Sequence, residues 1–229
     1  MKVAIMYSGG KDSTFAIDHA LEKGWDIEYL ISIKPNRTDC YLFHYATVEH
    51  TKKQAEILGL KHIYVTCDVV DPKLEADIVR KVVEKNPVDA VVLGGVGLQV
   101  TQIESIQKAL RDLKVEAFAS HAGEDHGVLF KSMIDKGYEI IITQIASDGL
   151  KDWLGKVVTK DNFNLLEEDS ITYGFHLGFE GGYADTLVLN SPLFKEKLHV
   201  INIKKNFDSE YSGYIELELK RKNIMDMVS

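Results

Sequence analysis

The N-terminal stretch from residue 3 to residue 21 constrains the fold more than any other part of the chain. It begins with the apolar run 3–6, breaks into a Ser- and Gly-containing loop at 8–13, and continues with apolar residues at helical spacing. A short unbroken apolar run before a glycine turn is typical of a buried strand in a parallel sheet. The sequence therefore predicts a strand, a glycine loop and a helix.

The loop of this unit is suited to binding an anion, because the N-terminus of a helix presents backbone N–H groups and the positive end of its dipole. Adjacent glycines let the backbone approach a ligand closely, and serine hydroxyls donate further hydrogen bonds. An aspartate beside a phosphate is best explained by a divalent cation between them, which makes Asp12 a candidate Mg²⁺ ligand. The predicted phosphate-binding residues are Ser8, Gly9, Gly10, Lys11, Asp12 and Ser13.

The first half of the chain repeats the alternation of strand and helix. Further strands are expected at 26–33, 63–65, 90–93 and 115–118, and helices at 48–58, 74–83 and 103–113. Single helices between strands predict a doubly wound parallel sheet of the Rossmann-like, HUP-type α/β class, with the ligand at the carboxyl ends of the strands. Gly94 and Gly95 follow the fourth strand, where they either let a nucleotide approach or form a tight turn.

The rhythm changes after residue 120. A helix is expected at 130–136, followed by strands at 139–145, 186–189, 197–203 and 214–219, the last two antiparallel. This pattern predicts a smaller C-terminal α+β domain. The segment with His121, Glu124, Asp125 and His126 lacks the spacing of a metal site, so a solvated loop is favoured there. Trp153 is expected to anchor packing and not to stack on a base.

Charge and composition narrow the range of partners. A net charge of −8 argues against a broad basic surface for nucleic acid. No apolar run approaches the roughly 20 residues that a membrane helix needs, and the first strand stands where a signal peptide would be. A cytoplasmic location without a membrane partner is therefore expected. Cys40 and Cys67 are too few and too far apart for a disulfide framework or metal cluster, and are expected to be buried small residues.

Four segments, in the right order, resemble the diphthine ammonia ligase (diphthamide synthetase) family. The first is the loop at 8–13, which matches the Ser-Gly-Gly-x-Asp-Ser pyrophosphate loop (PP-loop) of N-type ATP pyrophosphatases, in the adenine nucleotide alpha hydrolase-like superfamily. The second comprises residues 39–44 and 54–59, the third residues 149–155, and the fourth residues 176–194. The resemblance thus extends over residues 2–194.

This resemblance implies an ATP-dependent ligase that adenylates a carboxylate, releases pyrophosphate, and then joins the carboxylate to ammonia with release of AMP. By resemblance the acceptor is diphthine on translation elongation factor 2, the product is diphthamide, and ATP and Mg²⁺ are required. We predict an ATP-binding domain over residues 1–120 and a substrate-binding domain over 121–229. The predicted catalytic residues are Asp12, Ser13, Glu180 and Asp185. His44, Gly94 and Gly95 are predicted to contact ATP beside the PP-loop.

Alternatives stay open for the residues outside the loop. His44 is either a site residue or a packed histidine. Glu180 and Asp185 either bind Mg²⁺ and orient ammonia or belong to a glycine turn with solvated acids.

The acceptor half departs from the family pattern. Tyr183 and Asp185 stand where the family has glutamates, Phe179 stands where it has glycine, a Pro-x-Trp element is missing near residue 120, and both arginines of a family segment are lost at 98–104. Arginine clamps carboxylates and phosphates bidentately, which glutamine cannot do. A diverged paralogue that only binds ATP or AMP therefore remains open, as does an enzyme that adenylates a tRNA or a small molecule. The oligomeric state, a homodimer included, also remains open.

Overall fold

The computed structural model of the chain describes residues 1–36, 47–95 and 100–221. The chain divides into two compact units, Met1–Gly123 and Glu124–Ser229. In the described residues, no helix is both long and apolar enough to cross a membrane.

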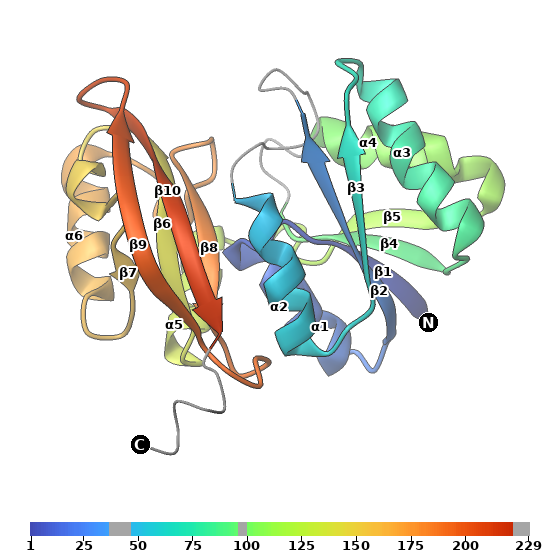
Figure 1. Cartoon of the computed structure of the whole chain (residues 1–229), viewed down its shortest axis with the longest axis horizontal. Helices are drawn as coiled ribbons and strands as arrows, with labels where there is room; N and C mark the ends of the chain where they lie inside the picture. Colours follow the sequence, from blue (N-terminus) through green and yellow to red (C-terminus); the bar gives the residue numbers. More distant parts are fainter. Residues whose placement is uncertain (37–46, 96–99, 222–229) are drawn as a thin grey trace. The chain divides into compact units, whose positions relative to one another are not determined.

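The N-terminal unit is built on one five-stranded parallel sheet with the order β3-β2-β1-β4-β5 (Figure 1). The strands are β1 (Lys2–Met6), β2 (Asp26–Pro35), β3 (His62–Cys67), β4 (Ala90–Leu93) and β5 (Glu116–Ala119). The helices are α1 (Lys11–Glu22), α2 (Thr51–Leu58), α3 (Pro72–Lys85) and α4 (Val100–Leu110), with single 3₁₀ turns at η1 (Val48–His50) and η2 (Arg111–Leu113). The predicted doubly wound α/β sheet is confirmed.

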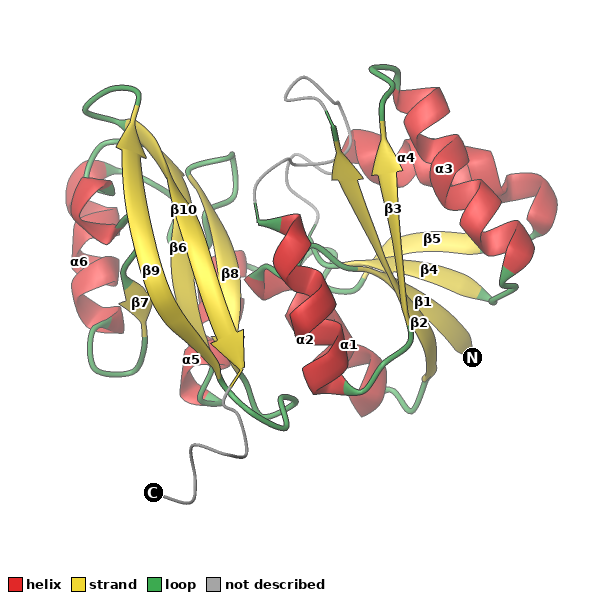
Figure 2. Ribbon diagram, in the orientation of Figure 1, coloured by secondary structure: helices red, strands yellow, loops and turns green. Residues whose placement is uncertain are grey.

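Helices cover both faces of this sheet, with α1 and α2 opposite α3 and α4 (Figure 2). Ala4 and Met6 of β1 belong to the same core cluster as Val79 of α3 and Ile106 of α4. The alternate residue Ile5 is equally inaccessible to solvent, on the face of β1 that α1 covers. A strand that is buried on both faces has no polar side, which explains the unbroken apolar run in the sequence.

Capping residues account for a helix boundary that the apolar spacing placed wrongly. α3 begins at Pro72 and not at residue 74, because the Asp71 carboxylate accepts hydrogen bonds from the backbone N–H groups of Lys73 (3.0 Å) and Leu74 (2.9 Å). An aspartate N-cap followed by proline at the first helical position is a strong start signal.

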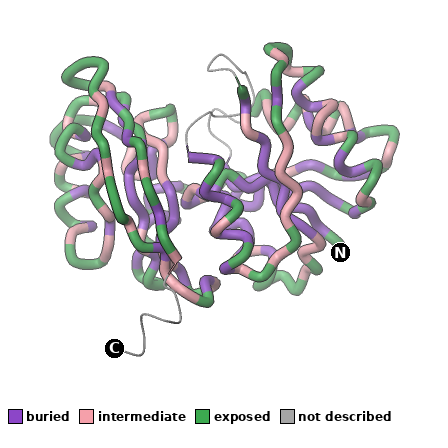
Figure 3. Tube along the Cα trace, viewed as in Figure 1, coloured by how far each residue is buried: buried purple, intermediate pink, exposed green. Residues whose placement is uncertain are grey.

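The C-terminal unit contains an antiparallel sheet with the order β7-β6-β10-β9, in which β8 also pairs with β6. Its strands are β6 (Glu139–Ala146), β7 (Val157–Val158), β8 (Ala184–Asn190), β9 (Leu198–Phe207) and β10 (Ser212–Arg221). Its helices are α5 (His126–Asp135) and α6 (Phe163–Tyr173), with a 3₁₀ turn at η3 (Lys151–Trp153). Figure 3 shows buried residues along β1, β4 and β6, whereas β9 is largely exposed. The predicted α+β class is confirmed, although the spacing did not reveal α6 and β7.

The expected solvated loop at 121–126 is wrong for both of its histidines. His121 and His126 are each only 2% exposed, while Glu124 and Asp125 are exposed. His121 stacks on the ring of Phe15 at a centroid distance of 4.9 Å. His126 is the first residue of α5, which begins four residues before the predicted start because Asp125 caps it.

The third segment of the family pattern forms core structure. Leu150, Trp153 and Leu154 are almost completely buried. The Trp153 indole N–H donates to the Asp169 carboxylate at 2.7 Å, and the Lys156 ammonium lies 4.3 Å from the centroid of the indole ring. Trp153 is thus a packing anchor, as predicted. Cys67 is buried as predicted, and Cys40 lies outside the described residues.

Candidate functional site

The PP-loop (residues 8–13) joins β1 to α1, and its two glycines have different roles. Gly9 has a φ of 81°, a left-handed conformation that favours glycine. Gly10 is the N-cap of α1, and no side chain among the described residues caps this helix. Such a helix start offers its first N–H groups and its dipole to an anion.

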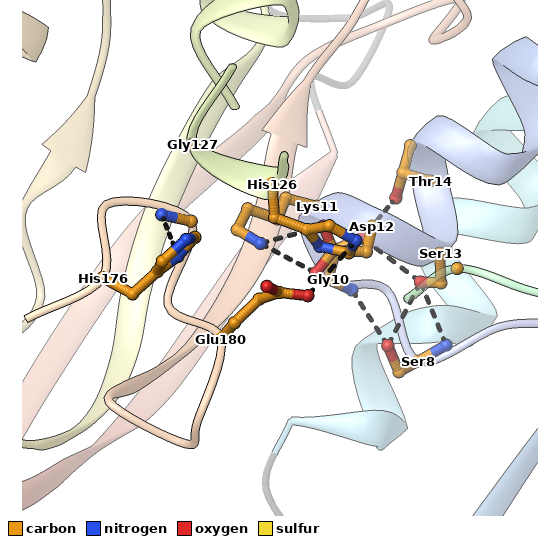
Figure 4. A network of polar contacts seen from close by, with 12 residues as sticks. Ser8, Gly10, Lys11, Asp12, Ser13, Thr14, His126, Gly127, His176 and Glu180 are labelled. Atoms are coloured by element: carbon orange, nitrogen blue, oxygen red, sulfur yellow. Dashed lines mark hydrogen bonds and ion pairs between the residues drawn. The ribbon is translucent and has the colours of Figure 1, made fainter. Parts of the chain in front are cut away.

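Two hydroxyl groups hold the loop in a closed turn. The Ser8 and Ser13 hydroxyl oxygens are 3.1 Å apart, and the Ser8 backbone N–H donates to Ser13 Oγ at 3.3 Å (Figure 4). The Gly10 carbonyl accepts hydrogen bonds from Ser13 Oγ (3.2 Å) and Thr14 Oγ1 (2.9 Å). These contacts fix the conformation of the loop.

Polar side chains from neighbouring elements support the loop and the residue before it through hydrogen bonds to backbone carbonyls. Gln54 of α2 is completely buried and donates through Nε2 to the Gly9 carbonyl at 3.1 Å. On β2, the buried Ser32 donates to the Tyr7 carbonyl at 2.6 Å, and His62 Nε2 lies 2.8 Å from Ser32 Oγ. Burial, assisted by a nearby lysine, lowers the pKa of His62. Sequence reasoning assigned no role to these three side chains, since a polar residue inside an apolar pattern does not reveal its partner.

Gly94 lies against the start of α1. This contact explains why glycine stands here, and the sequence alone did not suggest it. A Cβ at this position would lie 2.4 Å from both the Asp12 carbonyl carbon and the Ser13 nitrogen. Only glycine lets the end of β4 come this close to the first turn of α1. Contact of Gly94 and Gly95 with the nucleotide remains a prediction.

Lys11 and Asp12 form an ion pair within the loop. The Lys11 ammonium lies 2.7 and 2.9 Å from the two carboxyl oxygens of Asp12, and the lysine side chain is only 3% exposed. The described residues contain no group of three or more His, Cys, Asp or Glu side chains that could hold a metal ion. Mg²⁺ needs only one or two protein carboxylates when phosphates complete its shell, so Asp12 is chemically suited as its ligand.

The predicted catalytic residues of the C-terminal unit lie in different settings. Glu180 follows Phe179, which has a φ of 61°, and precedes two glycines with positive φ. Its carboxylate oxygen lies 3.4 Å from His126 Nε2 (Figure 4). Asp185 is half-buried on β8, opposite Gln144 of β6. His44 lies outside the described residues.

Charged and polar groups surround the start of α5, close to His126. The Asp125 carboxylate accepts the backbone N–H groups of Val128 (3.0 Å) and Gly127 (2.7 Å), which hold the pKa of Asp125 below its usual range, with help from His176 and His126. His176 Nδ1 accepts the Gly178 N–H at 3.1 Å. The composition of residues 121–126 gave no sign that His126 would be buried beside Glu180.

Comparisons with known proteins point to the same family for both units. The model of the diphthamide synthase N-terminal domain matches residues 1–117, and that of the C-terminal domain matches residues 125–224. The chain is similar to a diphthine–ammonia ligase of Rattus norvegicus, with 29% identity over 87% of the chain and 83% of the relative. The corresponding values are 27%, 100% and 94% for the Mus musculus ligase, and 26%, 97% and 94% for the Homo sapiens ligase.

One solved structure is similar at a lower level. It is that of a predicted subunit of tRNA methyltransferase from Methanocaldococcus jannaschii, with 16% identity and a TM-score of 0.42 over 84% of this chain and 98% of that chain.

Proposed function

Because the chain belongs to the diphthamide synthase family, we propose that it joins ammonia to the carboxylate of diphthine on translation elongation factor 2. An ATP-dependent, amide-forming ligase of the diphthamide pathway follows from the family and its relatives. Diphthine on elongation factor 2 as the acceptor is what we add to this assignment. The observation that carries the proposal is the PP-loop, a glycine turn at a helix start that no described side chain caps.

In the first half-reaction, the PP-loop binds the β and γ phosphates of ATP. A carboxylate oxygen of diphthine attacks the α phosphorus, so that an acyl–phosphate bond forms and the bond to pyrophosphate breaks. The N–H groups at the start of α1 and the Ser8 and Ser13 hydroxyls stabilise the charge that develops on departing pyrophosphate. Lys11, a buried residue of the loop itself, adds a positive charge at the phosphates.

Mg²⁺ would be held by Asp12 and would neutralise phosphate charge. Both oxygens of this carboxylate accept hydrogen bonds from the Lys11 ammonium in the structure.

In the second half-reaction, ammonia attacks the activated carbonyl carbon. A C–N bond forms, the C–O bond to AMP breaks, and the amide is released together with AMP. We assign Glu180 and Asp185 to the ammonia and acceptor side. Glu180 is the better supported of the two, because its carboxylate lies beside a buried imidazole.

The test is to incubate the purified chain with α-labelled ATP, Mg²⁺ and ammonium, with and without elongation factor 2 that carries diphthine. AMP is expected only when the factor is present. Ser13→Ala should lower the rate by about 10²-fold, the usual effect of losing one oxyanion donor. Ser209→Ala, in an exposed turn, is the matched control. AMP formation independent of the factor, or unchanged in Ser13→Ala, would contradict the proposal.

A further inference from the structure

His126 is a buried histidine that the two half-reactions above do not use. It opens α5, it is only 2% exposed, and its Nε2 lies 3.4 Å from the Glu180 carboxylate (Figure 4). Histidine changes its protonation state near neutral pH, and an imidazole beside a carboxylate is a common acid–base pair in enzymes. The His126 imidazole beside this carboxylate is therefore chemically suited to accept a proton.

The approach of the two segments depends on a glycine. A Cβ on Gly178 would lie 2.5 Å from the His126 carbonyl carbon and 2.6 Å from its Cβ. Next to it, Phe179 is buried, with its ring centroid 5.6 Å from that of Phe130 on α5. The absence of a side chain at one residue and the aromatic packing of the next fix this segment on α5. Glu180, the following residue, is thereby held at the imidazole.

Other charged and polar groups lie around His126. Asp125 precedes it, and the lowered pKa of that carboxyl keeps it ionised. His176 accepts the Gly178 N–H at Nδ1, so its own ring proton is on Nε2. Asp125 and Glu180 are thus two anions near one imidazole, with His176 as a third titratable group. Two carboxylates close together suit the binding of an ammonium ion, which carries the opposite charge.

We propose that His126 is the base of the amide-forming half-reaction and that Glu180 holds the ammonium ion beside it. This inference rests on the proposed function. Ammonium is almost fully protonated at neutral pH and has no lone pair, so a base must remove one proton before attack. His126 takes that proton, and the nitrogen lone pair then forms the C–N bond. The C–O bond breaks with its electrons going to AMP, and the second proton lost by the nitrogen goes to water.

The test compares two nucleophiles in His126→Gln. Hydroxylamine is neutral near pH 7 and needs no such deprotonation, so it should form a hydroxamate without the help of His126. We expect amide formation from ammonium to fall by about 10²-fold, a usual contribution of general base catalysis. Hydroxamate formation and ATP–pyrophosphate exchange, both measured with diphthine-bearing elongation factor 2, should stay within about twofold of wild type. His199→Gln, at an exposed position of β9, is the matched control.

Glu180→Gln keeps the inference testable if the buried substitution impairs folding, because the Glu180 side chain is 30% exposed. It should raise the KM for ammonium and leave hydroxamate formation near wild type. An equal loss with both nucleophiles would show that the pair is structural, and unchanged use of ammonium would show that it is not the base. If the wild-type chain itself gave no exchange with the factor, the proposed function would fail, and this inference with it.

Discussion

Replacing Gly94 by alanine should damage the PP-loop through a backbone clash. The new Cβ would lie 2.4 Å from the Asp12 carbonyl carbon and the Ser13 nitrogen. Ordinary van der Waals contact begins near 3.4 Å, so β4 or the first turn of α1 must move by about 1 Å. The neighbouring atoms belong to the backbone, so a rotamer change cannot relieve the contact. Misplacement by about 1 Å can lower a rate by about 10²-fold, and overpacking typically costs about 1–3 kcal/mol of folding free energy.

ATP–pyrophosphate exchange and thermal unfolding would measure the two effects separately. Gly94→Ala should reduce exchange by about 10²-fold and lower the melting temperature by about 2–12 °C, at about 2–4 °C per kcal/mol for a chain of this size. Gly137→Ala is the control, because it adds strain at a φ of 93° but meets no atom within 4 Å. It should lower stability and leave exchange intact. Wild-type exchange and an unchanged melting temperature in Gly94→Ala would show that a side chain at this position does not clash with the first turn of α1.

Three further predictions concern single side chains. Gln54→Glu removes the hydrogen-bond donor to the Gly9 carbonyl, so denaturant unfolding should show a loss of about 1–3 kcal/mol of folding free energy. Titration should also show weaker ATP binding, and unchanged affinity would mean that Gln54 does not support the loop. Phe179→Gly relieves the strain of a left-handed φ, worth about 1 kcal/mol, but removes a buried ring worth about 3–5 kcal/mol. The free energy of unfolding should therefore fall by about 2–4 kcal/mol, and a gain in stability would contradict this expectation. The pKa of Asp125 is lowered in the folded chain, so the Asp125 carboxylate should stabilise the fold fully above its unfolded pKa of about 4. This contribution should fade as the pH falls through the lower folded value, and melting curves of Asp125→Asn should lack this acid-dependent loss.

The sequence predicted the fold of the N-terminal unit well, because the signals for its strands and helices are local. An apolar strand, two glycines and a helical pattern follow one another within residues 3–21, and each constrains the chain by itself. Repetition of this strand and helix pattern was enough to predict the parallel sheet. Trp153 was correctly expected to be a packing anchor, since a large indole in an apolar segment is usually buried.

The remaining features depend on contacts between distant residues. Gly94 needs its glycine because of the α1 backbone, Gln54 supports a loop 45 residues away, and His126 is buried near a segment that lies beyond residue 175. None of these partners can be read from spacing. Phe179 illustrates the same point, because its left-handed backbone conformation favours glycine, while its contacts with Phe130 and Phe175 explain how this chain tolerates phenylalanine.

Transfer of nitrogen into the acceptor can be followed directly. Elongation factor 2 that carries diphthine would be incubated with the chain, ATP, Mg²⁺ and ammonium enriched in heavy nitrogen, and its modified histidine would be analysed by mass spectrometry. We expect one heavy nitrogen per modified histidine, one AMP formed per amide, and loss of both in Ser13→Ala. If ATP bound to the chain without AMP formation while the diphthine carboxylate of the factor stayed unchanged, the chain would not be the ligase that amidates diphthine.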